Sequence, residues 1–302
     1  MPRNSLAHLR SDLSVEPGWD PNILGPIYAL AMSGDTLFVG GDFSSIGGVE
    51  RSFLASVRRS TGSLGDWNAG DIGVVKALAV VGESLIMATF NRFIASDVLV
   101  AMDIRRARPV WTISTDGSVE ALLVADTTLY FGGRFTRVGV QARNSVGAVD
   151  LKTHRLNSWN PNANGAVYAL ALSGNTMYLG GYFTFVGGEP RAKLAAVDCT
   201  SGAIKDWNAY ANGYVYALAI FDGKLYAGGN FNTINNVRRN GIASLDTITA
   251  LLTDWDPNVG GNVSMLKVSG STLYAGGNFT MVGALLRKYL AALNATTGEA
   301  TD

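Results

Sequence analysis

The sequence predicts an all-β chain built from one repeated, four-stranded antiparallel unit. All six tryptophans fall in a single series, with spacings of 48, 44, 48, 48 and 48 residues: Trp19, Trp67, Trp111, Trp159, Trp207 and Trp255. Each unit contains four short segments rich in β-branched and aromatic residues, separated by turn residues. No window shows a long apolar stripe of helical period. Four antiparallel strands in each repeat of this length are typical of the blades of a β-propeller.

The repeat that begins at Val167 shows the expected strands in order. The first is V-Y-A-L-A-L-S (167–173), which stops at a Gly-Asn turn, and the second is T-M-Y-L-G-G-Y-F (176–183). The third is L-A-A-V-D (194–198), and the fourth ends at Trp207. Short links with Ser-Gly, Asp-Gly or Thr-Gly join the first pair and the last pair of strands, and such links favour hairpins.

Packing between blades explains three further features of the repeat. First strands such as V-Y-A-L-A-L-S are apolar at almost every position, which predicts burial on both faces by neighbouring blades. Glycine pairs inside the second strands, at 40–41, 132–133, 180–181, 228–229 and 276–277, predict a bulge or a close approach of backbones. The recurring Trp is expected to fill the gap between blades, which would contribute about 2–3 kcal/mol in each blade.

The number of blades depends on the two ends of the sequence. Six copies of the inner strand pair are present, and the copy from Val75 is degraded, being four residues short and lacking the glycine pair. Residues 3–19 and 287–302 both match the outer strand pair, which makes seven outer pairs. We expect one propeller domain over 1–302 with six blades, in which these two segments take part in ring closure. Seven blades, or a segment of a longer array, are the alternatives.

Composition excludes several classes of function. The chain has 302 residues and a formal net charge of zero, which argues against a nucleic-acid or anionic-membrane partner. No apolar run of 18 residues is present, so no transmembrane helix is expected. Cys199 is the single cysteine, which excludes an internal disulfide, and it is expected to be a small packing residue. The first residues, M-P-R-N-S-L, do not resemble a secretory leader, although a leader could precede them.

A search for catalytic or metal-binding motifs predicts no catalytic residue, metal or cofactor. The two histidines, His8 and His154, occupy non-equivalent positions, and no P-loop or hydrolase motif is present. The glycine pairs lie between strands with no helix after them, which excludes a phosphate loop. The W-x-P-N loops offer one carboxylate each at most, too few for calcium. Their Asp and Asn are expected to cap turns, as are the aspartates that end third strands: Asp103, Asp150, Asp198 and Asp246.

Arginine recurs in one register of the repeat, 16 residues before a Trp or before the place where one would be expected. The members are Arg3, Arg51, Arg143, Arg191, Arg239 and Arg287. These arginines could form a ring of guanidinium groups that binds an anionic partner. The favoured alternative is that each arginine holds its own loop by donating to backbone carbonyls. Arg105, Arg106 and Arg108 add a local positive edge to the degraded repeat, which is expected to be solvated.

One position of the first strands varies from repeat to repeat. Its residues are Tyr28, Lys76, Glu120, Tyr168, Tyr216 and Ser264. Lys76 and Glu120 fall in adjacent repeats and could form an ion pair. The tyrosines could flank a polar tunnel mouth on which a small polar ligand or a sugar stacks. Tyr210, Tyr214 and Phe185 lie in loops expected on one face, and this group is the predicted binding patch together with the arginine loops.

The run L-Y-x-G-G-x-F-T-x-V-G-G-x-x-R-x-x-L-A-A-V-D, continued by T-G and W-N-P-N, resembles a β-propeller repeat family of large secreted and surface-anchored bacterial proteins, the delta-sixty repeat. The matching phenylalanines are Phe43, Phe135, Phe183, Phe231 and Phe279. More distantly, the sequence is similar to kelch, galactose-oxidase-type and fungal cortical marker propellers, without a Tyr/His copper set. The resemblance covers nearly the whole chain and implies an extracellular, non-catalytic module.

Three functions are therefore considered. The leading hypothesis is an extracellular or cell-surface scaffold that binds a protein or glycan partner through one face. The second is a structural spacer or assembly unit, because a surplus outer strand pair leaves an edge that can recruit another chain. The third is a polysaccharide-active enzyme that uses Glu120 or Asp116, although glycosidases need two carboxylates at a fixed separation and nothing else in the sequence supports this pair.

Overall fold

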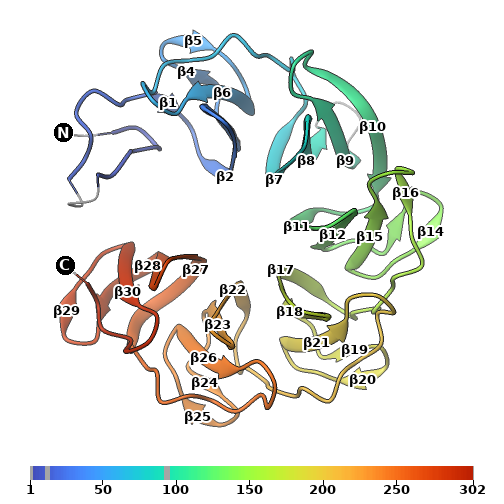
Figure 1. Ribbon diagram of the computed structural model, residues 1–302, viewed down its shortest axis with the longest axis vertical. Coiled ribbons are helices and arrows are strands. Elements are labelled where there is room, and N and C mark those ends of the chain that lie inside the picture. Colours follow the sequence, from blue (N-terminus) through green and yellow to red (C-terminus); the bar gives the residue numbers. More distant parts are fainter. Residues whose placement is uncertain (1–2, 11–13, 92–95, 302) are drawn as a thin grey trace. The chain divides into compact units, whose positions relative to one another are not determined.

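The computed structural model describes residues 3–10, 14–91 and 96–301, and side chains at 91 and 96 are left aside. These residues form an all-β chain (Figure 1), and none of them belongs to a helix that could span a membrane. The chain divides into two compact units. Unit 1 comprises Met1–Leu129, Phe135–Ala142 and Leu151–His154. Unit 2 comprises Tyr130–Arg134, Arg143–Asp150 and Arg155–Asp302.

Unit 1 begins with a regular repeat and continues with the degraded one. The regular repeat forms a sheet of order β2-β3-β6, and a small sheet of order β1-β4-β5 lies beside it in the chain. The strands are β1 (Ile23–Leu24), β2 (Ile27–Ser33), β3 (Thr36–Gly41), β4 (Ser45–Ile46), β5 (Val49–Glu50) and β6 (Leu54–Arg58). The degraded repeat forms a six-stranded sheet of order β14-β13-β10-β9-β8-β7. Its strands are β7 (Val74–Val81), β8 (Ser84–Asn91), β9 (Ser96–Asp103), β10 (Arg108–Thr115), β13 (Arg137–Val138) and β14 (Gln141–Ala142).

The third repeat has the sheet order β11-β12-β15-β16, and the boundary between the units runs through β12. Its strands are β11 (Val119–Ala125), β12 (Thr128–Gly133), β15 (Val146–Asp150) and β16 (Arg155–Leu156).

Unit 2 continues with three regular repeats, each an antiparallel sheet. The fourth and fifth repeats have a separate two-stranded ribbon after the second strand, whereas in the last repeat the second strand itself extends and pairs with the short strand that follows it. The fourth repeat has β17 (Ala166–Ser173), β18 (Thr176–Tyr182), β19 (Phe185–Val186), β20 (Glu189–Pro190) and β21 (Leu194–Asp198). The fifth has β22 (Val215–Phe221), β23 (Lys224–Gly229), β24 (Thr233–Ile234), β25 (Val237–Arg238) and β26 (Ile242–Asp246). The last has β27 (Val259–Ser269), β28 (Thr272–Val282), β29 (Leu285–Leu286) and β30 (Leu290–Asn294).

The fourth strand is shorter than the sequence predicts in most repeats. It is reduced to a single bridge at Val57–Leu64, Val197–Ile204, Leu245–Leu252 and Leu293–Ala300. The physical reason is that the chain leaves the sheet just after the bridge, which allows the following Trp to enter the core. The degraded repeat differs, because its fourth strand β10 is eight residues long and contains Trp111.

A bulge lies opposite the glycine pairs, as the sequence predicts. Opposite Gly180 and Gly181, strand β17 pairs Val167 with Gly181 and Ala169 with Gly180, so Tyr168 is the additional residue of a bulge. A Cβ on Gly181 would lie 2.1 Å from the carbonyl oxygen of Ala166 in the same sheet. A Cβ on Gly180 would lie 2.7 Å from Cγ1 of Val215 in the following repeat. The first glycine therefore allows close packing of repeats, and the second allows the bulge.

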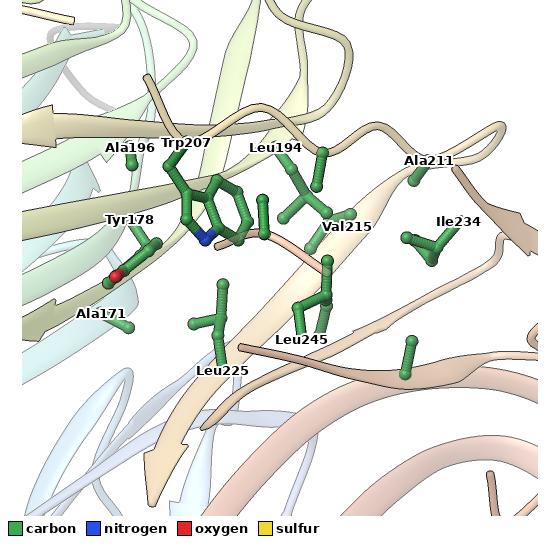
Figure 2. Close-up of a cluster of buried hydrophobic side chains, with 14 of the residues drawn as sticks. Ala171, Tyr178, Leu194, Ala196, Trp207, Ala211, Val215, Leu225, Ile234 and Leu245 are labelled. Carbon is green, nitrogen blue, oxygen red and sulfur yellow. The ribbon is translucent and has the colours of Figure 1, made fainter. Parts of the chain in front are cut away.

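Each regular junction buries a tryptophan between two repeats, as predicted. In Figure 2, Trp207 lies among residues of the fourth repeat, such as Tyr178 and Leu194, and of the fifth, such as Val215 and Leu225. Trp19, Trp159, Trp207 and Trp255 are all buried, whereas Trp67 and Trp111 are half-buried. The indole N–H groups of the four buried tryptophans donate to backbone carbonyls about forty residues further along the chain.

Burial of the first strands differs from the expectation. The second strands are almost completely buried, as in β18, but β17 and β22 are only half-buried. In β2 the alternate residues Tyr28, Leu30 and Met32 are exposed. The unbroken apolar pattern of these strands therefore overstated how much of their second face is covered.

The two terminal segments have different local structures. Strand β30 pairs with β28, and Leu293 bridges Ala300, so the C-terminal outer pair completes the sheet of its own repeat. At the other end, a bridge between Leu9 and Val15 forms the outer pair, and Trp19 donates to the carbonyl of Arg59 at 2.8 Å. The domain extent over 1–302, the number of blades, ring closure by these segments and self-association stay predictions.

Candidate functional binding surface

The varying position of the first strands coincides with the bulges. Register shifts mark Tyr28, Lys76, Tyr168, Tyr216 and Ser264 as the additional residues of their strands. A bulge leaves one residue out of the regular pairing and re-aims its side chain. A glycine pair lies opposite the bulge in the regular repeats, and the degraded repeat forms the same bulge opposite Ala88 and Thr89, while the bulged residue varies. The fold thus presents a set of variable side chains on a constant backbone.

In unit 2 the bulged tyrosines belong to a continuous aromatic cluster. The rings of Tyr168 and Tyr216 lie 5.7 Å apart, and those of Tyr214 and Tyr216 lie 6.0 Å apart in an edge-to-face arrangement. Tyr182 extends the cluster, because its ring centroid is 4.4 Å from that of Tyr214. We name Tyr168, Tyr182, Tyr214 and Tyr216 the tyrosine cluster. Tyr182 is 49% exposed, and the other three tyrosines are half-buried. Tyr182 is therefore the most accessible member, and the other rings are partly packed against the protein.

Two cations lie over the tyrosine cluster. The Arg134 guanidinium carbon is 5.1 Å from the ring centroid of Tyr168, and the Lys193 ammonium is 5.7 Å from that of Tyr182. These distances are within the range of cation–π attraction. Burial raises the pKa of the Tyr216 hydroxyl, Tyr168 and Tyr214 add to the rise, and Arg134 opposes it. The Tyr216 phenol therefore stays neutral at physiological pH, and Arg134 and Lys193 supply positive charge beside the cluster.

The backbone at Lys193 has the same conformation in other repeats, where different residues occupy the position. Lys193 adopts a left-handed φ of 68°, and Phe53, Gly241 and Tyr289 adopt 67°, 68° and 68° at the equivalent position. The amide of Lys193 donates to Phe183 and its carbonyl accepts from Gly181, both at 3.0 Å. Gly241 makes the same two bonds, with Phe231 and Gly229. Because backbone hydrogen bonds fix this residue in repeats with different side chains, the side chain at this position is free to vary.

In unit 1 the same position of the first strands carries charged side chains. The Lys76 ammonium lies 4.4 Å from the ring centroid of Tyr28. Burial raises the pKa of Asp97, the nearby Glu120 raises it further, and Lys76 opposes the rise. Glu120 also accepts a hydrogen bond of 2.7 Å from the Ser118 hydroxyl. Lys76 and Glu120 thus share an electrostatic neighbourhood, which includes Asp97, a residue that the sequence analysis did not consider.

Asp116, the other carboxylate of the enzyme hypothesis, has a structural role. It accepts hydrogen bonds from the Thr136 amide and hydroxyl and from the Arg137 amide, at 2.7, 2.5 and 2.8 Å. Burial raises its pKa, but these hydrogen bonds prevail and the net pKa is lowered. An ionised carboxylate with these partners caps a turn and is a poor general acid.

The arginine register holds the loops that lead to the tryptophans. Arg51 donates to the carbonyl of Trp67, Arg143 to Asn157, Arg191 to Lys205 and Arg239 to Thr253, at 2.8, 2.8, 3.2 and 2.9 Å. Arg3 donates to Pro17 at 2.8 Å, while Arg287 donates to its neighbour Leu286 at 3.3 Å. All six guanidiniums thus donate to backbone carbonyls, as the favoured alternative proposed. A role for the register in partner binding stays a prediction.

The predicted patch of Tyr210, Tyr214 and Phe185 is divided in the structure. Tyr214 joins the tyrosine cluster, whereas the ring contacts of the described residues do not include Tyr210 or Phe185. Tyr210 is 37% exposed and Phe185 is 44% exposed, and both adjoin the bridges between the inter-repeat loops and the ribbons. They therefore present separate aromatic area, and their role in binding stays a prediction.

The turn-capping prediction is confirmed for three aspartates. Asp103, Asp198 and Asp246 each accept two backbone amides of the following turn, at 2.7–3.0 Å. These bonds lower the pKa of all three carboxyl groups. The described residues contain no group of three or more His, Cys, Asp or Glu that could hold a metal ion. His8 packs against Trp19 and His154 stacks on Trp111.

Arg134, Tyr182 and Lys193 are the residues that sequence reasoning missed. A signal was present for two of them, because the position between the glycine pair and the phenylalanine reads Asp42, Arg134, Tyr182, Asn230 and Asn278. A variable residue inside a constant motif indicates a position at which the fold requires no particular side chain. The third has no such signal, since its neighbourhood depends on the left-handed loop.

Comparison with known structures supports this architecture. The chain is similar to the computationally designed Ika8 protein (15% identity, 92% of this chain and 86% of that chain covered, TM-score 0.57). It is also similar to the WD40 beta propeller domain of Doa1 (11% identity, 83% and 75% covered, TM-score 0.59). The Neurospora crassa Pan2 WD40 domain matches at 15% identity, with 76% and 65% covered and a TM-score of 0.53. The fold is a β-propeller.

The sequence comparisons agree with this fold. A family model described as "Domain of unknown function (DUF5122) beta-propeller" matches residues 222–247, which span β23 to β26. None of the curated proteins matches the chain. The predicted fold class is therefore confirmed, and the match places a propeller repeat within the fifth repeat of this chain.

Proposed function

We propose that this chain is a non-catalytic, extracellular propeller that binds an acidic segment of a partner protein on the tyrosine cluster. The observation that carries the proposal is the run of ring contacts from Tyr168 to Tyr182 with Arg134 and Lys193 above it. Tyr and Arg are the residue types that dominate the energetics of protein interfaces. Rings that already pack against each other lose little conformational entropy on binding.

Charge selects the class of partner. The two cations lie beside neutral phenols, so a partner segment that offers carboxylates next to apolar side chains would complement the surface. Arg134 can pair with a carboxylate in a bidentate manner, whereas Lys193 supplies a point charge. A glycan could also stack on tyrosines, but the interfacial composition favours protein. Location outside the cell follows from the family resemblance and is tested by fractionation of the source cells.

Selection from a displayed peptide library tests the proposal. We expect wild-type protein to enrich peptides that combine Asp or Glu with an apolar residue. Tyr216→Ser and Arg134→Gln should weaken the best peptide about 30-fold and about 5-fold, as losses of about 2 and 1 kcal/mol imply. Tyr210→Ser is the matched control, because it removes an exposed tyrosine outside the cluster, and it should leave the affinity unchanged.

The same variants separate the alternatives. Peptides that bind all variants equally would overturn the assignment of the tyrosine cluster. Binding of the protein to a glycan array that depends on Tyr216, with no peptide enriched, would replace the protein partner by a carbohydrate.

A further inference from the structure

Three Asn-Gly dipeptides of unit 2 differ in the contacts that surround them. They are Asn164–Gly165, Asn212–Gly213 and Asn240–Gly241. In an Asn-Gly dipeptide the glycine nitrogen can attack the amide carbon of the asparagine side chain, because glycine has no Cβ to hinder ring closure. A succinimide forms, ammonia leaves, and water then opens the ring to aspartate or isoaspartate. The surroundings of each dipeptide decide how fast this reaction runs.

Two backbone amides hold the side-chain carbonyl oxygen of Asn164. The amides of Thr184 and Phe185 both donate to its Oδ1 at 2.9 Å. Attack by the Gly165 nitrogen turns this oxygen into an oxyanion, and hydrogen bonds to an anion are stronger than those to a neutral amide. The two donors therefore stabilise the tetrahedral intermediate more than the starting amide, as an oxyanion hole does.

The leaving nitrogen of Asn164 lies beside a hydroxyl group. Its Nδ2 donates to Oγ1 of Thr184 at 2.9 Å. A hydroxyl in this place can pass a proton from solvent to the nitrogen as the bond from Cγ to Nδ2 breaks. Asn164 is exposed, so water reaches the site. The amide of Gly165, which supplies the attacking nitrogen, makes no hydrogen bond within the part of the chain that the structure describes.

Asn212 has the same oxygen contacts but lacks the hydroxyl. Its Oδ1 accepts from the amides of Asn232 and Thr233 at 3.0 and 3.1 Å. Its Nδ2 donates to the side-chain oxygen of Asn232 at 2.6 Å. An amide oxygen holds the leaving nitrogen but has no proton to pass to it. Asn212 is therefore a natural comparison that isolates the effect of the Thr184 hydroxyl.

The third dipeptide has its attacking nitrogen engaged. The amide of Gly241 donates to the carbonyl of Phe231 at 3.0 Å, and the side chain of Asn240 donates to that of Asn258 at 2.7 Å. Attack by this nitrogen first requires the bond to Phe231 to break. Asn240 is therefore expected to react slowly in the folded protein.

The position equivalent to Asn164 in the third repeat already holds the product of this reaction. Asp116, which lies 48 residues earlier and is also followed by glycine, accepts the amides of Thr136 and Arg137 at 2.7 and 2.8 Å. Its second oxygen accepts from the Thr136 hydroxyl at 2.5 Å. An aspartate at position 164 can therefore keep every contact, with the Thr184 hydroxyl donating in place of accepting.

We propose that Asn164 is a site of spontaneous deamidation in the folded protein. The Gly165 nitrogen loses its proton to hydroxide and bonds to Cγ, the bond from Cγ to Nδ2 breaks, and Nδ2 leaves as ammonia with a proton passed through Thr184. A Cβ on Gly165 would lie 2.1 Å from the carbonyl oxygen of Tyr182, so the new carboxylate arises at the edge of the tyrosine cluster. There it repels an acidic segment, a consequence that rests on the proposed function, whereas the reaction does not.

Peptide mapping by mass spectrometry during incubation tests the reaction, because it separates Asn, Asp and isoaspartate at all three dipeptides. In the folded protein we expect Asn164 to react at least about 10-fold faster than Asn240, since only Asn164 combines the oxyanion donors with an unengaged glycine amide. We also expect Asn164 to react faster in the folded protein than in urea, where the three sites should have similar rates.

Exchange of one side chain between the two repeats is the matched control. Thr184→Asn should slow Asn164 by about 5-fold, and Asn232→Thr should speed Asn212 by a similar factor. Both variants should fold, because each copies the side chain of the other repeat. Slower reaction of Asn164 in the folded protein than in urea would overturn the proposal. Rates at Asn164 and Asn212 that the exchange leaves unaltered would do so as well.

Asn164→Asp tests the consequence for binding separately. It should weaken the best selected peptide by about 2- to 5-fold, and added salt should reduce the effect. Unchanged affinity, while Tyr216→Ser still weakens the peptide, would refute the repulsion and leave the proposed function standing. Unchanged affinity in both variants would instead refute the proposed function of the tyrosine cluster.

Discussion

The indole nitrogen of Trp207 lies 2.9 Å from the backbone carbonyl oxygen of Asp246, the residue at which the third strand of the following repeat ends. Trp159 and Asp198 have the same relationship at 3.0 Å, again 39 residues apart. At these junctions one repeat is thus bonded to the next by a buried tryptophan side chain. Where the bond is made, a shifted indole would miss the carbonyl, so the bond favours a fixed spacing between the tryptophan and the third strand of the next repeat.

Because Trp207 makes the indole hydrogen bond, whereas Trp67 has no partner for it among the described residues, Trp207→Phe and Trp67→Phe should lower the unfolding free energy by different amounts. Trp207→Phe removes a buried donor from the Asp246 carbonyl and leaves a gap, and we expect the unfolding free energy to fall by about 2–4 kcal/mol. Trp67→Phe removes a donor that already lacks a partner, so its cost should be at least about 1 kcal/mol smaller. Denaturant unfolding of both variants measures the difference. Equal losses would show that the indole bond contributes nothing beyond packing.

The two glycines of a pair should tolerate alanine differently. In Gly181→Ala the new Cβ would meet the Ala166 carbonyl oxygen, a backbone atom that cannot move without breaking the bulge, and we expect a loss of about 3 kcal/mol. Gly180→Ala meets a Val215 methyl group, which can shift, so about 1–2 kcal/mol is expected.

Gly18→Ala is the control for the glycine pair, because a Cβ there meets nothing within 4 Å, and thermal unfolding should show little change. A reversed order of the two pair variants would contradict the assigned contacts.

Alkaline pH should weaken the junction that contains Tyr226. Burial raises the pKa of its hydroxyl to about 12, and the ordinary value is about 10. Because the folded-state pKa is the higher one, this contribution to stability is complete below pH 10. It is lost as the pH rises toward 12, where the unfolded state releases its proton first. Unfolding measured from pH 9 to 12 should show a smaller decline for Tyr226→Phe than for wild type. Parallel declines would contradict the shift.

Low pH should destabilise the turns that aspartates cap, whereas alkaline pH destabilises the Tyr226 junction. Amide hydrogen bonds lower the pKa of Asp198 and Asp246, so their contribution is present above the ordinary value and is lost as the pH falls through the lowered one. Asp246→Asn should keep the cap, because Asn294 accepts the same two amides in the last repeat. Asp246→Ala should cost about 1 kcal/mol at neutral pH. Equal stability of the two variants would contradict the capping role.

The sequence predicts the fold well because its signals are local and repeated. The glycine pair, the Asp-capped turn and the Trp spacing each report a backbone constraint, and each is found in the structure. The predicted fourth strand fails because strand propensity says nothing about where the chain must leave the sheet. Burial of the first strands fails for a similar reason, since an apolar pattern shows what can be buried and not what covers it.

The candidate surface is predicted only in part. The sequence identifies Tyr168 and Tyr216 because the residue at their position varies within an otherwise constant motif. Its extension to Tyr182 and Lys193 depends on ring contacts across two repeats and on a left-handed residue, which no local pattern encodes.

Amide hydrogen exchange with the tightest selected peptide bound tests the proposed function most directly. If the tyrosine cluster is the binding surface, exchange should slow at residues 182, 193 and 214–216, and Tyr216→Ser should abolish that protection. Exchange near Tyr210 and in the arginine loops should not change. Protection confined to those loops, or retained in full by Tyr216→Ser, would contradict the account.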